Sequence, residues 1–238
     1  MKIASKSDTG KKRNNNEDCI CVDNEMGIFL LADGMGGHQA GEVASDLAVK
    51  EALAYLQESI GRDNENDVSK LLAEASFKAN DAIKEKAKTD LNLMGMGTTL
   101  VQMIIKEGKA HICNVGDSRA YLLREDLRQI TKDHTVGDYL VEHGIMSREE
   151  IPPQKWHTLT QAVGTSGDIV PELTQIELNE GDCLLLCSDG LTDMLNDAEI
   201  EEIIKKHSED PDKAVEALIK RANKKGGRDN ISVVIVKI

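Results

Sequence analysis

Four aspartates stand where an apolar run meets a glycine or a turn, and this recurrence is the main chemical signal of the chain. They are Asp33 in LLADGMGGH, Asp117 in NVGDSRAY, Asp189 in LLLCSDGLTD and Asp229 in GGRDNISVV. A carboxylate at a strand end lies at the rim of a sheet, where several rims can converge on one point. Carboxylate and carbonyl oxygens are the ligands that Mg²⁺ and Mn²⁺ prefer. Together the four residues predict a divalent-cation site, although any single Asp-Gly pair is more often a plain turn.

Other kinds of site are excluded by the spacing of the same segments. The GMGG run after Asp33 lacks the pattern of a P-loop and of a dinucleotide-binding loop. Ser118 and Ser188 lack a G-x-S-x-G context, so both are expected to be structural. The six histidines show no H-E-x-x-H or H-x-H pattern, and the five cysteines lack the spacing of a zinc site. We expect the cysteines to be buried free thiols.

The net charge of the chain disfavours polyanionic partners. Its 238 residues carry 29 Lys plus Arg against 42 Asp plus Glu, which gives a formal net charge of −13. Such a charge repels phosphate backbones and anionic lipid, so we expect no nucleic-acid partner and no membrane partner. The N-terminus has no apolar signal-peptide region, and no apolar run approaches the roughly 18 to 20 residues of a spanning helix. These features predict a cytoplasmic protein of one domain, residues 1–238.

Hydrophobic periodicity predicts short strands on either side of two long helices. Apolar residues recur every three or four positions over 42–60 and 67–88, which predicts two amphipathic helices. Apolar runs of strand length predict a hairpin at 20–23 and 27–32 and a β-meander at 98–105, 109–115, 119–123 and 127–131. The last third predicts strands at 182–187 and 231–238, with helices near 197–207 and 211–223 between them. Segment 134–163 breaks this rhythm and predicts a surface excursion.

Eight segments in a fixed order resemble the metal-dependent serine/threonine protein phosphatases of the phosphatase 2C type (the PPM family), in their compact bacterial form. The segments are RNNNED (13–18), ADGMGGHQAGEVAS (32–45), GMGTTL (95–100), NVGDSRAYL (114–122), KDHT (132–135), LTQAVG (159–164), LCSDGLTD (186–193) and GRDNISV (227–233). The resemblance covers nearly the whole chain. It implies an α+β fold, a four-layer α-β-β-α sandwich of two antiparallel β-sheets flanked by helix pairs, with 134–163 as a surface flap.

The resemblance also implies a site for two Mn²⁺ or Mg²⁺ ions. Asp33 would bridge the two cations, the carbonyl of Gly34 would bind one, and Asp189 and Asp229 would hold the other. Asp117 resembles the residue that binds a third, weaker cation, although a turn with Arg119 as an ion partner explains it equally well.

Three further residues acquire roles from the same resemblance. Glu17 and Asp18 would orient metal-bound waters, and Arg13 would bind the substrate phosphate with its planar fork. A lysine-rich neighbourhood leaves open that Arg13 is simply solvated. Animal members have a histidine where this chain has Met35, so the general acid stays unassigned, and His38 is better explained as a residue at the start of a helix than as that acid.

The implied activity is hydrolysis of phosphoserine and phosphothreonine in proteins by a metal-bridged water or hydroxide, without a covalent phosphoenzyme. The substrates would be phosphoproteins, including a cognate serine/threonine kinase whose action the enzyme reverses, and we expect a monomer. Two alternatives stay open at this point. One is a phosphatase-fold module that binds phosphoproteins without hydrolysis, and the other is a hydrolase of small phosphate esters.

Overall fold

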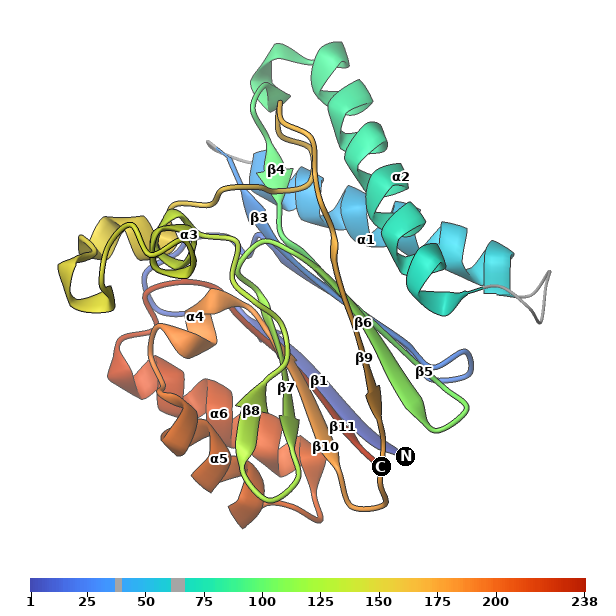
Figure 1. Ribbon diagram of the computed structural model, residues 1–238, viewed down its shortest axis with the longest axis vertical. Coiled ribbons are helices and arrows are strands. Elements are labelled where there is room, and N and C mark those ends of the chain that lie inside the picture. Colours follow the sequence, from blue (N-terminus) through green and yellow to red (C-terminus); the bar gives the residue numbers. More distant parts are fainter. Residues whose placement is uncertain (37–39, 61–66) are drawn as a thin grey trace.

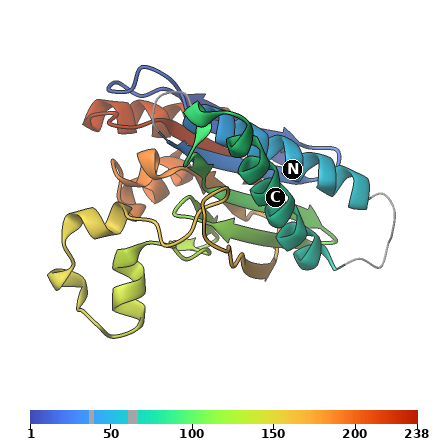
Figure 2. The ribbon, with the colours of Figure 1, turned by 90° about the horizontal axis from the view of Figure 1, so that it is seen from above.

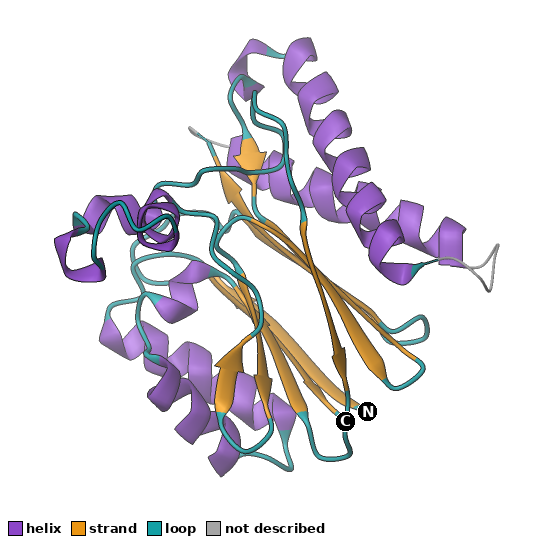
Figure 3. Cartoon of the chain, in the orientation of Figure 1, coloured by secondary structure: helices purple, strands orange, loops and turns teal. Residues whose placement is uncertain are grey.

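A computed structural model describes residues 1–36, 40–60 and 67–238, and the structural statements below concern these residues. Two antiparallel sheets lie face to face, and helices cover both outer faces (Figure 1; Figure 3). His38 lies outside the described residues. No described helix is long and apolar enough to cross a bilayer.

The first sheet has the strand order β1-β11-β10-β7-β8. Its strands are β1 (Lys2–Asp8), β11 (Ile231–Lys237), β10 (Cys183–Cys187), β7 (Arg119–Leu123) and β8 (Leu127–Gln129). Helices α5 (Asp197–Lys206) and α6 (Pro211–Lys225) cover its outer face (Figure 1). Both helices start at a side-chain cap, because Asn196 and Asp210 accept hydrogen bonds from the first turn.

The second sheet has the order β2-β3-β5-β6-β9, with the short β4 paired to β3. Its strands are β2 (Asp18–Asp23), β3 (Ile28–Met35), β4 (Gly97–Thr98), β5 (Leu100–Lys106), β6 (Lys109–Val115) and β9 (Glu172–Glu177). Helices α1 (Ala40–Ile60) and α2 (Val68–Thr89) cover its outer face, and the short η1 (Leu91–Leu93) follows α2.

Strand β3 shows why the sandwich needs strands that are apolar on both faces. Phe29 and Leu31 point into the apolar layer between the two sheets. Ile28, Leu30 and Ala32 point the other way, into the layer under α1 and α2. Because successive side chains of a strand alternate between its faces, burial of both faces requires the uninterrupted apolar run IFLLA.

The sandwich that the resemblance implies is confirmed, but the predicted β-meander is wrong. Strands β5 and β6 pair in one sheet, whereas β7 and β8 pair in the other. The chain crosses between the sheets at Gly116, whose φ of +112° is a conformation that favours glycine. Strands β1 and β9 were not predicted, because both lie at sheet edges and mix polar with apolar residues.

The predicted surface excursion, residues 134–163, forms a lobe that we call the flap. It contains α3 (Val136–Glu142), η2 (Arg148–Glu150) and η3 (Pro153–His157), and it projects from the body of the sandwich (Figure 2). Trp156 packs on α3 so closely that a Cβ on Gly137 would lie 2.6 Å from its ring. The guanidinium of Arg148 lies 4.4 Å from the centre of the same ring, so the single tryptophan joins the flap's pieces.

Candidate metal centre

The ends of both sheets form one open cavity of about 710 Å³. Its lining includes seven of the eight residues that the resemblance assigns to the site: Arg13, Glu17, Asp33, Gly34, Asp117, Asp189 and Asp229. The four aspartates lie at the same end of the sandwich because β3 and β10 end there while β7 and β11 begin there. The predicted convergence of strand-end carboxylates is therefore what the structure contains.

Hydrogen bonds to Thr98 and Thr99 fix the backbone of Asp33. Its N–H donates to Thr99 Oγ1 at 2.9 Å, and its carbonyl accepts from Thr98 Oγ1 at 2.8 Å and from the N–H of Thr99 at 2.9 Å. Ser118 Oγ lies 2.7 Å from Thr99 Oγ1 and is fully buried, as expected of a structural serine. These contacts leave the Asp33 carboxylate as the only part of the residue that is available to a ligand.

Asp18 lies behind the cavity, as the cross-strand partner of Asp33. Its Oδ2 accepts a hydrogen bond from Ser188 Oγ at 2.8 Å, and Ser188 Oγ in turn accepts from the N–H of Ser232 at 3.0 Å. Ser188 is thus structural as well. Glu17 is buried, and its Oε1 accepts from Asn15 Nδ2 at 3.0 Å.

The carboxylates of this cluster are costly to ionise without a cation. Burial and the nearby negative charges raise the pKa of Asp33 and of Asp189 well above the ordinary range. Burial likewise raises the pKa of Asp18 and of Asp117 to about 6. The buried Oδ1 atoms of Asp18 and Asp189 have no hydrogen-bond partner in the described structure. Because the potential metal ligands of this cluster are all carboxylate oxygens, the cluster suits hard divalent cations such as Mg²⁺ and Mn²⁺.

Arg13 supplies the positive side of the cavity. Its Nη2 lies 2.6 Å from Asp229 Oδ2, and Asp229 Oδ1 accepts from the N–H of Asn230 at 2.8 Å. The buried Asn230 side chain fixes the loop that carries Arg13, since its Nδ2 donates to the carbonyls of Thr9 and Asn15 at 3.0 and 2.9 Å. Arg13 therefore faces the site and is more than a solvated surface charge.

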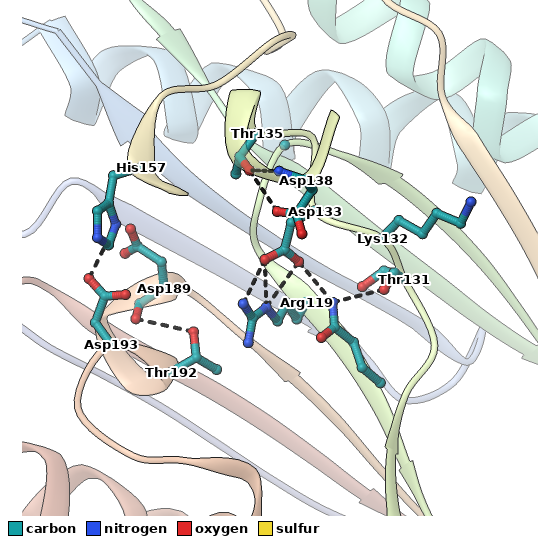
Figure 4. A network of polar contacts seen from close by, with 12 residues as sticks. Arg119, Thr131, Lys132, Asp133, Thr135, Asp138, His157, Asp189, Thr192 and Asp193 are labelled. Atoms are coloured by element: carbon teal, nitrogen blue, oxygen red, sulfur yellow. Dashed lines mark hydrogen bonds and ion pairs between the residues drawn. The ribbon is translucent and has the colours of Figure 1, made fainter. Parts of the chain in front are cut away.

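Two residues at the cavity rim were not predicted from the sequence. Asp193 is the C-cap residue of the short helix α4 (Asp189–Thr192), one turn after Asp189, and its N–H donates to the Asp189 carbonyl at 2.8 Å. His157 reaches it from the flap, with Nδ1 3.6 Å from Asp193 Oδ2 (Figure 4). One ligand atom each from His157, Asp189 and Asp193 lie within 4.8 Å of one another. The i, i+4 spacing of the two aspartates is a signal that the sequence contains, whereas nothing local marks His157.

The flap is anchored beside the cavity by a partly buried ion pair. Arg119 donates to both carboxylate oxygens of Asp133, with distances of 2.6 to 2.9 Å (Figure 4). Arg119 follows Asp117 by two residues, yet its partner is Asp133 at the base of the flap. Arg119 therefore makes its direct ion pair with Asp133, while its charge also acts on Asp117 and lowers the pKa of that carboxyl group against the effect of burial.

The comparisons with known proteins agree with this geometry. The family model described as protein phosphatase 2C matches residues 9–232. The chain is 38% identical to the serine/threonine phosphatase stp of Listeria innocua over 243 residues, covering 100% of this chain and 96% of that one. It is also 38% identical to the protein phosphatase PhpP of Streptococcus pneumoniae, covering 100% and 98% of the two chains.

Solved structures give the same result. The crystal structure of the Mycobacterium tuberculosis serine/threonine phosphatase PstP/Ppp superposes with a TM-score of 0.88 at 38% identity, covering 98% of this chain and 97% of that one. A structure of the PstP catalytic domain in complex with two manganese ions gives a TM-score of 0.85 at 38% identity, covering 98% and 96%. The fold and the family expected from the eight segments are confirmed, and the chain belongs to the protein phosphatase 2C family.

Proposed function

We propose that this protein removes phosphate from phosphoserine and phosphothreonine in proteins, and that Asp33, Gly34, Asp189 and Asp229 hold two Mn²⁺ or Mg²⁺ ions for the reaction. The observation that carries the proposal is the convergence of buried, mutually repelling carboxylates beside Arg13 in one cavity. When bound, such cations lower the pKa of water and neutralise phosphate charge.

The residues around the cations would position water and substrate. The Arg13 guanidinium is a planar fork that matches two phosphate oxygens and stabilises the negative charge of the transition state. Glu17 and Asp18 would accept hydrogen bonds from water and so orient it, with Asp18 held in place by Ser188. Met35 lines the cavity, and its thioether has no proton to give, so the leaving group is protonated by another donor.

A third cation at Asp117 forms part of the same proposal, with Asp193 and His157 as further ligands. Asp117 and Asp193 both line the cavity, and the negative charge of each raises the pKa of Asp189. Burial raises the pKa of Asp193 too. Because an imidazole nitrogen suits Mn²⁺ better than Mg²⁺, the two metals should differ at this position.

The only tryptophan of the chain reports on this third position, because Trp156 precedes His157. We expect Mn²⁺ titration to change Trp156 fluorescence in a weak phase that Asp193→Asn and His157→Gln each shift to at least about tenfold higher concentration. Asp212→Asn, an exposed carboxylate on α6, is the matched control. If His157→Gln alters the fluorescence of the metal-stripped protein but not the Mn²⁺ titration, the residue only holds the flap through Asp193.

The proposed activity is tested with chelator-stripped protein and a phosphothreonine peptide. We expect phosphate release only after Mn²⁺ or Mg²⁺ is added back, and little with Ca²⁺, whose preferred shell is larger and looser. Turnover of p-nitrophenyl phosphate without turnover of any phosphopeptide would move the assignment to small esters. Binding of the peptide without turnover by the metal-loaded, folded protein would move it to a phosphoprotein-binding module.

The cellular setting follows from the same proposal. The substrates are proteins that serine/threonine kinases have phosphorylated, and a cognate kinase is itself one of them. The protein acts as a monomer in the cytoplasm. All five cysteines are free, and Cys113, Cys183 and Cys187 are buried. Unpaired cysteines in this number support a reducing compartment.

A further inference from the structure

A groove of about 740 Å³ lies between β1, the loop that follows it, and the C-terminal half of α6. We call it the basic groove, because Lys6, Lys11, Lys220 and Lys224 line it and all four are exposed. Lys6 and Lys11 come from the N-terminal end of the chain and Lys220 and Lys224 from the C-terminal end, more than 200 positions away in the sequence. Only the packing of α6 against β1 makes them neighbours.

Lysines outnumber carboxylates in the basic groove, where Lys6, Lys11, Lys220 and Lys224 face Asp8 and Glu216. None of these four lysines forms an ion pair within the described structure, whereas Arg221 and Lys225 on α6 both pair with Glu199. Asp8 Oδ1 accepts hydrogen bonds from the N–H of Gly10 at 2.9 Å and from Asn223 Nδ2 at 3.0 Å, which fix its carboxylate against the groove wall. With Asp8 and Glu216 counted against the four lysines, the groove keeps an excess of two positive charges. In a chain with a net charge of −13, this surface is an exception to the overall negative potential.

The basic groove adjoins the metal cavity. The N–H of Lys11 donates to the Gly227 carbonyl at 2.8 Å. A Cβ on Gly10 would lie 2.1 Å from the carbonyl oxygen of Asp229, so this segment rests on the backbone that carries a proposed metal ligand. Arg13, two residues after Lys11, already lines the metal cavity. The segment 10–13 is therefore the shared wall between the two hollows.

We propose that the basic groove binds acidic polypeptide next to the phosphorylated residue, an inference that rests on the proposed phosphatase activity. The preferred substrates then carry Asp, Glu or a second phosphorylated residue near the phosphate that is removed. Because Lys11 lines the groove and Arg13 lines the metal cavity, only two positions apart in the chain, the acidic residues belong a few positions from the phosphoresidue. A short acidic segment meets only the groove, whereas nucleic acid or an anionic bilayer would also meet the negative surface around it.

The test compares three phosphothreonine peptides that differ only in their flanks, with three acidic residues before the phosphothreonine, three after it, or neutral residues on both sides. The enzyme variants are Lys220→Glu/Lys224→Glu and the matched control Lys78→Glu/Lys86→Glu, which makes the same charge change at exposed positions of α2. For the wild type we expect kcat/KM to be at least about fivefold higher for one acidic peptide than for the neutral one, mostly through KM. The advantage should shrink at 0.5 M salt.

The double variant in the groove should lose this preference, and the control on α2 should keep it. Turnover of p-nitrophenyl phosphate normalises each preparation for metal content and folding. Equal kcat/KM for all three peptides, or a preference that survives Lys220→Glu/Lys224→Glu, would overturn the proposal. If that variant weakens the binding of an oligodeoxynucleotide while the peptide preference is unaffected, the groove serves nucleic acid and the proposal is wrong.

Failure of the phosphatase assignment is distinguishable from failure of this proposal. If the wild type hydrolyses no phosphopeptide with any metal, the activity fails. The groove is then tested by fluorescence anisotropy with the labelled acidic and neutral peptides and chelator-stripped protein. Binding that favours the acidic peptide and is lost in Lys220→Glu/Lys224→Glu supports the groove by itself, and equal binding of both peptides overturns it.

Discussion

Asp33→Asn is expected to lower kcat/KM by at least about 1,000-fold and to raise the melting temperature of the metal-stripped protein. Activity is expected to fall because an amide carries no negative charge with which to hold the two cations that we propose Asp33 would bind. Stability rises because Asp33 is buried among Asp18, Asp189 and other carboxylates that repel it. A neutral side chain of the same shape removes that repulsion, while the hydrogen bonds of the Asp33 backbone to Thr98 and Thr99 remain.

The pH dependence of this gain has a defined sign. A carboxyl group whose folded-state pKa is raised leaves stability intact below its unfolded pKa, near 3.9, and lowers it as the pH rises through the folded value. Burial raises the pKa of Asp33 well above the ordinary range, and it raises the pKa of its cross-strand partner Asp18 to about 6. The stability difference between Asp33→Asn and the wild type should therefore be small near pH 4 and grow as the pH rises to 7 and beyond.

Calorimetry in the presence of chelator, over pH 4 to 8, measures this difference. Asp126→Asn is the matched control, because its carboxylate is 90% exposed and lies far from the cavity in the fold. Added Mn²⁺ should stabilise the wild type more than Asp33→Asn, since it binds the wild-type folded state more tightly. Our account of the cluster is wrong if Asp33→Asn destabilises the chelator-treated protein at pH 7.5, or if it retains wild-type turnover.

Arg13→Ala is expected to lower kcat/KM for a phosphopeptide by about 100-fold or more. Arg13 is the only Lys or Arg side chain lining the described part of the cavity, so its loss removes the only guanidinium fork there that can bind two phosphate oxygens. Arg13→Lys keeps the charge but loses the planar fork, and we expect it to recover only part of the activity. Lys12→Ala, an exposed neighbour in the same loop, is the matched control.

Steady-state kinetics and inorganic phosphate inhibition together separate the possible roles of Arg13. If Arg13 binds phosphate, the inhibition constant for inorganic phosphate rises along with KM in Arg13→Ala. If Arg13 serves only to neutralise Asp229, whose Oδ2 lies 2.6 Å from Arg13 Nη2, inhibition by inorganic phosphate is unchanged and only the affinity for Mn²⁺ shifts. Equal kinetics for Arg13→Ala and Lys12→Ala would show that Arg13 is a solvated surface residue after all.

The fold illustrates how far hydrophobic patterning reaches. Helices α1 and α2 and strand β3 were predicted within a few residues, because the helices carry an apolar periodicity of their own and the strand carries an uninterrupted apolar run. Edge strands β1 and β9 show little apolar patterning, because many of their side chains are exposed to solvent. The crossing at Gly116 was missed because pairing partners of a strand depend on residues far away in the sequence.

The site divides in a similar way. By itself the sequence determined the chemical identity of the donors and their place at strand ends, because a carboxylate after an apolar run is a local pattern and the eight segments keep the family's order. Only the tertiary structure decided that Asp18 lies behind the cavity, that His157 meets Asp193, and that Lys6 and Lys11 share a groove with Lys220 and Lys224. The physical reason is that apolar periodicity records which face of an element is buried, whereas contacts between polar groups from distant segments are set by how those elements pack.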